Sequence, residues 1–144
     1  MAILTRCATL ASWTRGSRLP NLAKGLSRVE FVVADSEQLP FESGSFTALL
    51  CSSSFHHYPN PKRAVAEIAR VLAPGGRVAI ADGTSDRLPA RLADVVLRRL
   101  DHSHIRLHRA AELVALVTGA GFADVSSKSL WDGGYAIVTG RKAD

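Results

Sequence analysis

The sequence has no acidic residue before Glu30, although the same stretch contains five basic residues. Acidic and basic residues are equal in number from residue 30 to residue 144, so the formal net charge of +5 comes from the N-terminal stretch alone. A nucleic-acid-binding domain needs a basic face on its folded body, and this composition provides no excess charge for one. We therefore expect no nucleic-acid partner.

Long apolar runs and cysteine pairs are also lacking. No run approaches the ~18 apolar residues that a transmembrane helix requires, so we expect no membrane partner. The two cysteines, Cys7 and Cys51, lie far apart and indicate neither a disulfide framework nor a metal site. A reducing compartment fits this usage, and we expect a cytoplasmic protein. The arginine-containing start without acids leaves a mitochondrial location as the alternative.

Residues 1–28 differ in composition from the remainder of the chain. They are rich in Arg, Ser and Thr, and we interpret them as an atypical basic leader or a truncated beginning, followed by one domain over residues 29–144. Within this leader, residues 2–11 (AILTRCATLA) place polar residues where a buried strand would need apolar ones. We therefore expect no sheet strand there.

Strand and helix patterns alternate from Val29 onward. VEFVVA, FTALLCS and RVAIAD are short apolar runs of the kind found in buried parallel strands. ADVSSKSL and GYAIVTGR are predicted to be two closing strands near the C-terminus. This alternation predicts an α/β fold with helices on both faces of a sheet.

Three helices are predicted between these strands. Asn60 is a good N-cap and Pro61 suits the first position of the first helix. On that helix we expect Glu67 and Arg70 to face solvent, and Gly119 is a plausible residue just beyond the end of the last helix. The middle helix is predicted from apolar residues at helical spacing: Leu92, Val95, Val96 and Leu100.

Polar residues follow the three parallel strands. Because ligands of α/β sheets bind at the carboxyl ends of the strands, these positions define the candidate site. They are Asp35–Ser36, Ser52–Ser54 and Asp82–Gly83.

The segments ADSEQLPFESGSF, CSSSFHHYPNPKRAVAEIARVLAPGGR and AGF resemble the second half of a class I S-adenosylmethionine-dependent methyltransferase of the small-molecule type (methyltransferase type 11-like). The resemblance covers about residues 29–140. It implies a Rossmann-like sheet that ends in an antiparallel hairpin, S-adenosyl-L-methionine as cofactor, and methyl transfer to a small organic acceptor. Residues 29–144 would then be a partial methyltransferase domain.

The same resemblance implies a cofactor site. Asp35 would accept a hydrogen bond from the adenine amino group, a role suited to a carboxylate because it only accepts. The backbone N–H of Ser36 would meet an adenine ring nitrogen. Ser52 would contact the methionine end of the cofactor, and Ser53 would follow it toward the region of methyl transfer.

A histidine pair follows the second strand. His57 is the candidate general base, for acceptors that must lose a proton. His56 is the alternative, because we expect an extended segment here, in which neighbouring side chains point in opposite directions. Farther on, DHSHIR (residues 101–106) resembles a loop that some relatives place near the acceptor.

The glycine-rich loop and the first two strands of this family have no counterpart in the sequence before Val29. We therefore expect a gap between VEFVVA and FTALLCS, filled by a shift of one strand or left as exposed edges. Cofactor binding by this chain would be weak or absent. The alternative is a non-catalytic, methyltransferase-like interaction protein. The acceptor and the oligomeric state stay open.

Overall fold

The computed structural model describes residues 2–5, 8–11, 30–101 and 104–144. Three α-helices lie among these residues: α1 (Pro61–Val71), α2 (Leu88–Leu100) and α3 (Ala110–Gly119). Two short 3-10 helices are η1 (Phe55–His57) and η2 (Trp131–Gly133). The strands are β1 (Ala2–Thr5), β2 (Ala8–Ala11), β3 (Glu30–Val33), β4 (Phe46–Ser52), β5 (Leu72–Gly83), β6 (Phe122–Leu130) and β7 (Tyr135–Lys142).

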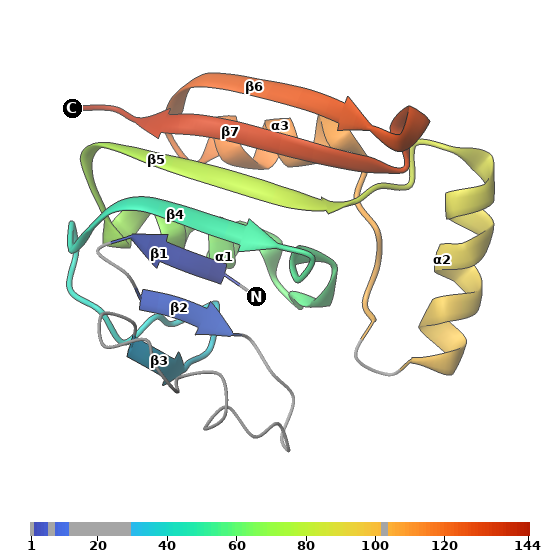
Figure 1. The fold of residues 1–144 in the computed structure, drawn as a ribbon, viewed down its shortest axis with the longest axis horizontal. Coiled ribbons are helices and arrows are strands. Elements are labelled where there is room, and N and C mark those ends of the chain that lie inside the picture. Colours follow the sequence, from blue (N-terminus) through green and yellow to red (C-terminus); the bar gives the residue numbers. More distant parts are fainter. Residues whose placement is uncertain (1, 6–7, 12–29, 102–103) are drawn as a thin grey trace.

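All of these strands form one sheet in the order β3-β2-β1-β4-β5-β7-β6 (Figure 1). Strands β2 and β3 are parallel, as are β4 and β5, whereas β1 is antiparallel to both of its neighbours. Strands β6 and β7 form an antiparallel hairpin, and β7 pairs with β5. The predicted α/β sheet with a closing hairpin is confirmed.

The N-terminal residues form sheet strands, so the prediction that residues 2–11 contribute none is wrong, as is the expected gap. Strand β1 pairs with β4 from Ala2↔Cys51 to Thr5↔Ala48, and β2 joins β1 to β3. The sheet ladder uses backbone N–H and C=O groups, which every residue here offers whatever its side chain. The otherwise unpaired edges of β3 and β4 therefore accept this antiparallel pair of strands. The proposed division at residue 28 stays a prediction.

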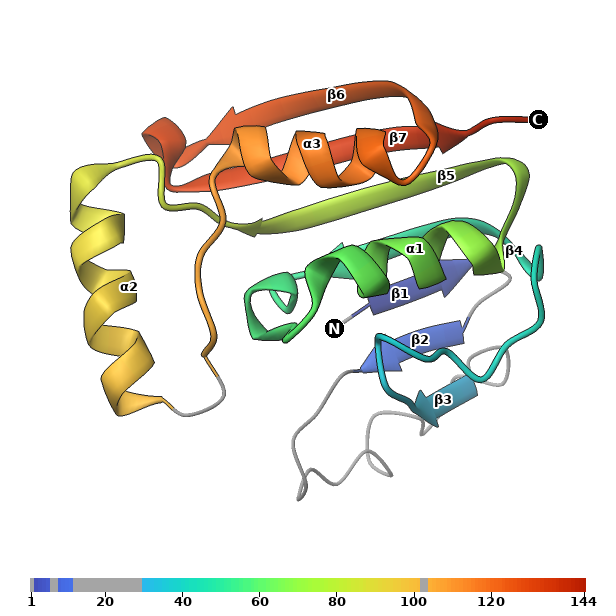
Figure 2. The ribbon, with the colours of Figure 1, turned by 180° about the vertical axis from the view of Figure 1, so that it is seen from behind.

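The two faces of the sheet are covered differently. Leu49, Val78 and Gly140 are register partners on the face toward α1 and α3, and a Cβ added at Gly140 would lie 3.0 Å from Val117 of α3. Figure 2 shows α1 and α3 on this face. The expected helix cover on both faces is thus found on one face only among the described residues.

The core lies between that face and the two helices. Helix α1 begins as predicted, with the side chain of Asn60 accepting a hydrogen bond from the N–H of Arg63 at 3.2 Å and with Pro61 in its first turn. Its apolar stripe packs beneath β4 and β5, and the buried members are Ala64, Val65, Ile68 and Val71.

Glu67 and Arg70 were expected to face solvent, but both side chains bond the loop before β4. The Arg70 guanidinium donates to the carbonyl oxygens of Leu39 and Phe41 at 2.9 and 2.7 Å. Glu67 accepts from the Leu39 N–H at 2.8 Å, and its hydrogen bond from Arg70 lowers the pKa of its carboxyl group. This ion pair on α1 therefore holds the loop that follows Asp35.

The last helix ends later than predicted. Helix α3 runs through Gly119, and the glycine that takes up the left-handed conformation is Gly121, at a φ of 87°. A residue with a Cβ would be strained at that φ, so a glycine is needed at position 121. The spacing of apolar residues does not fix the end of a helix to within two residues, and it therefore did not distinguish Gly119 from Gly121.

Candidate functional site

The carboxyl ends of β3, β4 and β5 lie at one edge of the sheet. Strands β3 and β4 run in the same direction, because each is related to the antiparallel strand β1 by the pairings described above, and β5 is parallel to β4. Asp35–Ser36, Ser52–Ser53 and Asp82–Gly83 therefore share this carboxyl edge. The structure thus brings the residues singled out by the sequence to one side of the molecule, and their roles stay predictions.

The edge is wide between β3 and β4. Two strands separate them, so their ends lie three strand spacings apart, about 14 Å. At the outer end, Asp35 is exposed, and its Oδ1 accepts a hydrogen bond from the Glu37 N–H at 2.8 Å. The Gln38 N–H donates to the Asp35 carbonyl at 3.1 Å and closes the turn. Asp35 is therefore held by a turn that also fixes Ser36.

At the inner end, Ser53 links three strands. Its backbone has a φ of 48°, its N–H donates to the Ala81 carbonyl at 2.8 Å, and its hydroxyl lies 3.0 Å from the hydroxyl of Tyr135. Ser52, which precedes it, is half-buried. The Ser53 hydroxyl is thus engaged by the protein, at the end of β4 that faces Tyr135 of β7.

A buried polar cluster supports this corner. Cys51 Sγ lies 3.3 Å from Ser54 Oγ and 3.5 Å from the Tyr58 hydroxyl. Burial raises the pKa of the Cys51 thiol, and it also raises the pKa of the Tyr58 hydroxyl. Both groups are therefore protonated at neutral pH, so Cys51 is not a thiolate nucleophile.

His56 is fixed by Asp82, a buried residue at the end of β5. His56 Nδ1 lies 2.7 Å from Asp82 Oδ1, and the His56 backbone N–H donates to Oδ2 at 3.0 Å. The Gly83 N–H also donates to Oδ1, at 2.7 Å. A carboxylate only accepts, so Nδ1 carries a proton, and in the neutral tautomer the lone pair is on Nε2.

The pairing with Asp82 was missed by sequence reasoning, which placed Asp82 at the edge without a role. The sequence did contain a signal for it: Asp82 ends one predicted strand, and His56 and His57 follow the neighbouring parallel strand. The expected extended segment at His56 and His57 is also wrong, because both residues belong to η1. Their rings lie 3.9 Å apart between centroids, and the His104 ring lies 5.3 Å from that of His56.

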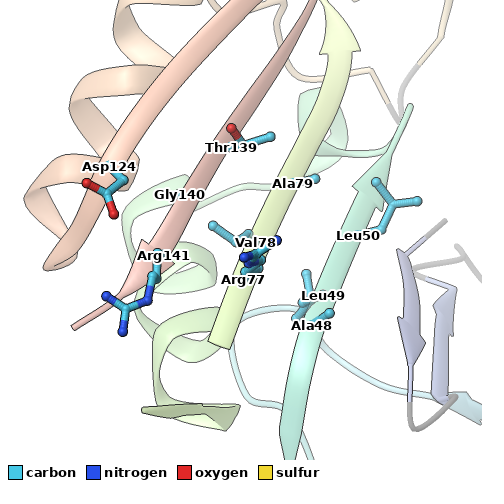
Figure 3. Close-up of a pocket in the computed structure, with 10 residues that line it drawn as sticks. All are labelled: Ala48, Leu49, Leu50, Arg77, Val78, Ala79, Asp124, Thr139, Gly140 and Arg141. Atoms are coloured by element: carbon cyan, nitrogen blue, oxygen red, sulfur yellow. The ribbon is translucent and has the colours of Figure 1, made fainter. Parts of the chain in front are cut away.

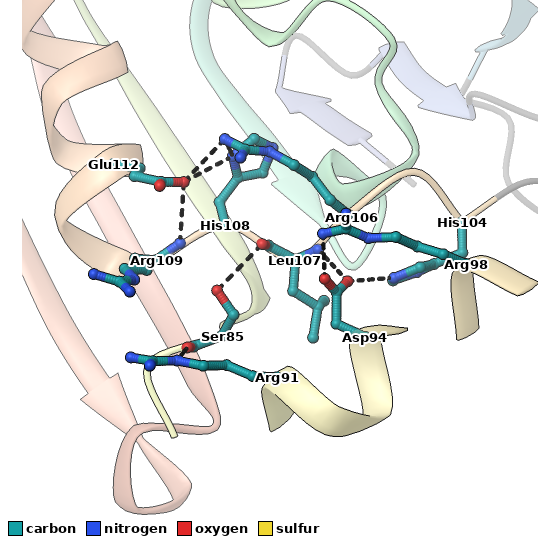
Figure 4. Close-up of polar contacts among 10 residues, drawn as sticks. All are labelled: Ser85, Arg91, Asp94, Arg98, His104, Arg106, Leu107, His108, Arg109 and Glu112. Atoms are coloured by element: carbon teal, nitrogen blue, oxygen red, sulfur yellow. Dashed lines mark hydrogen bonds and ion pairs between the residues drawn. The ribbon is translucent and has the colours of Figure 1, made fainter. Parts of the chain in front are cut away.

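The segment after α2 joins this histidine cluster. His104 Nε2 lies 2.7 Å from Asp94 Oδ1, which also accepts from the Leu107 N–H at 2.7 Å, and Arg98 bonds the other oxygen (Figure 4). Burial opposes ionisation of Asp94, but these hydrogen bonds outweigh it and lower the pKa of its carboxyl group. We call Asp94 with its partners Arg98, His104 and Leu107 the Asp94 clasp.

The Asp94 clasp is connected to η1 through the backbone. The N–H groups of Ile105 and Arg106 donate to the His56 carbonyl at 3.1 and 3.2 Å. The described part of residues 101–106, expected near the acceptor, therefore lies against His56. In the described ranges, no group of three His, Cys, Asp or Glu side chains is arranged to hold a metal ion.

A hollow of about 600 Å³ lies elsewhere, on the sheet (Figure 3). Leu50, Ala79 and Thr139 are register partners within it, on the face opposite α1 and α3. It extends toward the amino ends of β4 and β5, at Ala48 and Arg77, and therefore away from the carboxyl edge. This hollow contains none of the predicted site residues.

Strands β1 and β2 lie between β3 and β4, where the family would place its glycine-rich motif. Strand β1 starts at this edge with Ala2 and runs away from it, and β2 ends there at Ala11. Neither described strand contains a glycine. The exposed carboxylate of Asp35 suits the adenine amino group that the resemblance assigns to it, whereas the described residues of β1 and β2 lack the close backbone approach that glycines give.

Comparison with known proteins gives a consistent assignment. The family described as a methyltransferase domain matches residues 8–80, half of the chain. The chain is 30% identical over 138 residues to a demethylmenaquinone methyltransferase of Clavibacter sepedonicus, which covers 82% of this chain and 56% of that protein. It is 40% identical over 85 residues to a phthiotriol/phenolphthiotriol dimycocerosates methyltransferase of Mycobacterium leprae, covering 55% of this chain and 32% of that protein.

Solved structures agree on the fold. The crystal structure of the YcgJ protein from Bacillus subtilis superposes with a TM-score of 0.77 at 19% identity, over 96% of this chain and 82% of that one. A likeness at this identity shows the fold alone. The chain spans about half the length, or less, of the two curated relatives named above.

Proposed function

Because the chain belongs to the methyltransferase domain family, we propose that its carboxyl edge serves S-adenosylmethionine-dependent methyl transfer to a small organic acceptor. One observation carries the proposal: the ends of β3 and β4, with Asp35–Ser36 and Ser52–Ser53, lie at the same edge. Their separation of about 14 Å is a span that an extended nucleoside joined to an amino acid can bridge. The names of the two relatives give different acceptors, so only the acceptor class is proposed.

Each end of the edge has a chemical task. The exposed Asp35 carboxylate would accept from the adenine amino group, while the turn closed by Gln38 presents the Ser36 N–H. Ser52 would meet the methionine end. The cofactor supplies an activated methyl group when bound, so the protein needs chiefly to align the reactants and exclude water.

A proton acceptor is required only for an acceptor that must lose a proton. His57 is the base proposed from the sequence, and the structure adds a reason to test His56 beside it. Asp82 orients His56 and fixes its tautomer, as a carboxylate does for a general base. In this proposal Asp82 is a positioning residue and His56 or His57 takes the proton.

A ligand titration followed by NMR tests the cofactor site. We expect S-adenosylhomocysteine, the demethylated product, to bind more weakly than micromolar, because β1 and β2 offer no glycine-rich approach. Amide shifts should be confined to the carboxyl edge, at Asp35, Ser36, Ser52 and Gly83. Asp35→Asn should weaken binding about tenfold, the effect of one lost charge-assisted hydrogen bond.

Glu42→Gln is the matched control, since it makes the same change in an exposed acid at the opposite end of the β3–β4 connection. Micromolar affinity would contradict the expected weakness. Shifts centred on the hollow of Figure 3, or none at millimolar ligand, would count against the proposed site.

A histidine NMR experiment separates His56 from His57. Asp82→Asn should change the tautomer signals of His56 more than those of His57, because Asp82 Oδ1 lies 2.7 Å from His56 Nδ1. Equal changes in both rings would show that the pair acts as a unit. The tautomer readout does not depend on knowing the acceptor.

The alternative function, a non-catalytic interaction protein, has less support. It was motivated by the missing glycine-rich loop, and it would use an exposed sheet edge or the leader to join a partner. In the structure β4 is paired on both sides, with β1 and with β5. The family assignment also favours an enzyme.

A further inference from the structure

Helix α2 carries an exposed apolar surface. Among the described residues, nine large hydrophobic side chains are exposed, and six of them belong to this one helix. Leu100 is 76% exposed and Leu88 is 67% exposed. Scattered apolar side chains are ordinary on a protein surface, whereas a contiguous group of this kind marks a binding surface. The six are Leu88, Leu92, Val95, Val96, Leu97 and Leu100.

Four of these six side chains share one face of α2. Leu88, Leu92, Val95 and Val96 are spaced i, i+4, i+7 and i+8, which places them on one face of a helix. Asp94 lies on the other side, where the Asp94 clasp holds it buried against the segment that follows (Figure 4). The helix therefore binds the protein through polar contacts and presents its apolar face outward.

A second exposed apolar group lies beside the start of α2. Trp131, at the tip of the β6–β7 hairpin, is 77% exposed and has a φ of 50°. Its neighbour Asp132 forms an ion pair with Arg87, and a Cβ added at Gly133 would lie 3.4 Å from Arg87 Cγ. Figure 1 shows this tip next to the first turn of α2. Trp is typical of the boundary between water and lipid, because its ring is apolar and its N–H is polar.

The same region is basic. Residues 86–109 contain six arginines and three aspartates, although the chain from residue 30 onward has no net charge. Three of these arginines form ion pairs, Arg87 with Asp132, Arg98 with Asp94 and Arg106 with Glu112, and the other three are Arg91, Arg99 and Arg109. On α2, Arg99 lies within the apolar face by helical spacing and Arg91 lies beside it, where their stems can bury while the guanidinium groups reach phosphate. A partner with a negatively charged surface and an apolar interior matches this pattern.

We propose that α2, together with Trp131, docks on the surface of an anionic lipid bilayer. The helix would lie in the interface, with its leucine and valine side chains among the acyl chains and its arginines at the headgroups. In the described part of the chain no helix is long and apolar enough to cross a membrane. Docking at the surface has no such length requirement, so the expectation of no membrane partner, which rested on the lack of a spanning segment, does not address it.

A second copy of the chain fits this surface less well. A helix of 13 residues is about 20 Å long and its face about 10 Å wide. That face offers a few hundred Å², whereas a stable protein interface buries about 800 Å² per partner. A two-fold pair of α2 helices would also bring arginines together, because a symmetric interface faces itself.

Docking would also orient the candidate site. Helix α2 stands beyond the carboxyl edge of the sheet in both views (Figures 1 and 2), and its following segment contacts His56. A bilayer beneath α2 would therefore lie next to that edge. The docking proposal does not rest on the proposed methyl transfer, since it is argued from α2 and Trp131 alone.

Vesicle flotation with the full 144-residue chain tests the proposal. We expect the protein to float with phosphatidylcholine vesicles that contain about one-third phosphatidylglycerol, and to float much less with phosphatidylcholine alone. In a Trp13→Phe background, Trp131 is the remaining indole. Its fluorescence should shift to shorter wavelength on anionic vesicles and be quenched by brominated lipid.

Two variants and one control locate the binding surface. Leu92→Glu and Val96→Glu place a charge in the apolar face and should each lower partitioning about tenfold or more. Both side chains are exposed, so the fold should survive, as circular dichroism can verify. Val33→Glu is the control, because Val33 is an exposed apolar residue on β3, across the sheet.

Three results would overturn the proposal. The first is a failure to float with anionic vesicles. The second is flotation that Leu92→Glu and Val96→Glu leave unchanged. The third is a concentration-dependent dimer, seen by analytical ultracentrifugation, that the same variants abolish while vesicles bind neither form, which would assign the surface to a second copy.

Discussion

Helices α1 and α2 are of similar length, 11 and 13 residues, and both carry an apolar stripe, yet only α1 buries it. In α1 the stripe lies in the core beneath the sheet. In α2 the stripe is exposed, and the one fully buried side chain is that of Asp94. The pair shows that an apolar pattern sets where a helix forms, while the connections of the chain set whether that pattern meets a partner.

The difference follows from position in the chain. Helix α1 crosses between the parallel strands β4 and β5, so it must return along the face of the sheet that it connects. The connection from β5 to β6 contains two helices, α2 and α3. Of these two, only α3 packs on the face of the sheet that α1 also covers. Helix α2 is therefore left at the carboxyl edge, where polar contacts are sufficient to hold it.

The sharpest test of this comparison is a pair of truncations. Ile68→Ala in α1 should lower the free energy of unfolding by about 2–5 kcal/mol, because it leaves a cavity in the core. Leu92→Ala in α2 removes an exposed side chain and should change it by about 0.5 kcal/mol or less. Urea denaturation followed by circular dichroism measures both values.

A large loss from Leu92→Ala would break the comparison, since it would mean that α2 contributes apolar packing to the folded chain. The slope of unfolding free energy against urea should stay the same in both variants, because neither change alters how much surface unfolding exposes by more than one side chain.

Sequence patterns predicted most of the helices and strands, but they did not predict which surfaces of these elements pack against one another. The spacing at Leu92, Val95 and Leu100 predicted a helix, which is confirmed, but periodicity carries no information on what the face packs against. Residues 2–11 escaped prediction because their strands depend on backbone groups of β3 and β4, which are distant in sequence. Parallel strand directions correctly predicted that the carboxyl ends of β3, β4 and β5 share one edge, and the site at that edge stays a prediction.

The details of the site depended on tertiary contacts. Asp82 and His56 are 26 residues apart, and only the parallel pairing of β4 and β5 brings them within a hydrogen bond. Likewise, the turn at Ser53 needs a left-handed residue that is not glycine, which sequence preferences do not anticipate. The residue types at the strand ends could therefore be read from the sequence, whereas their hydrogen-bond partners could not.

A second test acts on the Asp94 clasp. Asp94→Ala removes the acceptor for His104, for Arg98 and for the Leu107 N–H, so α2 loses its buried anchor. We expect the free energy of opening for α2 amides to fall by about 1–3 kcal/mol, with α1 amides unchanged. Hydrogen exchange measured by mass spectrometry resolves the two helices separately.

Asp94→Asn provides the matched variant, because its amide oxygen can still accept while the charge is gone. An intermediate effect on α2 would assign part of the stabilisation to charge. Faster exchange in α1 as well would show that the two helices open together, contrary to the comparison.

A third, smaller test concerns helix starts. The side chain of Asn60 caps α1, whereas Arg87 precedes α2 without a side-chain cap. Asn60→Ala should lower the free energy of unfolding by about 1 kcal/mol, and Asn60→Asp should retain most of it because aspartate also accepts from the Arg63 N–H. Equal losses in the two variants would show that the hydrogen bond is not what stabilises the start of α1.

The smallest effect is expected from pH, at the junction of the two regions. His108 follows α2, and its ring packs against Phe55 of η1. Burial lowers the pKa of His108 below its ordinary value of 6.5, the charge of Arg106 lowers it further, and Glu112 partly opposes both. The folded chain therefore disfavours the protonated ring, whereas the unfolded chain accepts the proton at the ordinary value.

The sign of the pH dependence follows from that difference. Below pH 6.5 the unfolded state binds more protons at this position, so the stability that neutral His108 contributes is complete above 6.5 and declines as the pH falls toward the folded pKa. His108→Gln should therefore lose less stability than the unchanged chain between about pH 7.5 and about pH 5.5, as measured by urea midpoints. Asp94 follows the same sign but loses its contribution only below its ordinary value of 3.8. An equal loss of stability in both proteins between about pH 7.5 and about pH 5.5 would show that His108 does not cause the decline. Helix α2 would still be expected to detach below pH 3.8, where Asp94 loses its contribution.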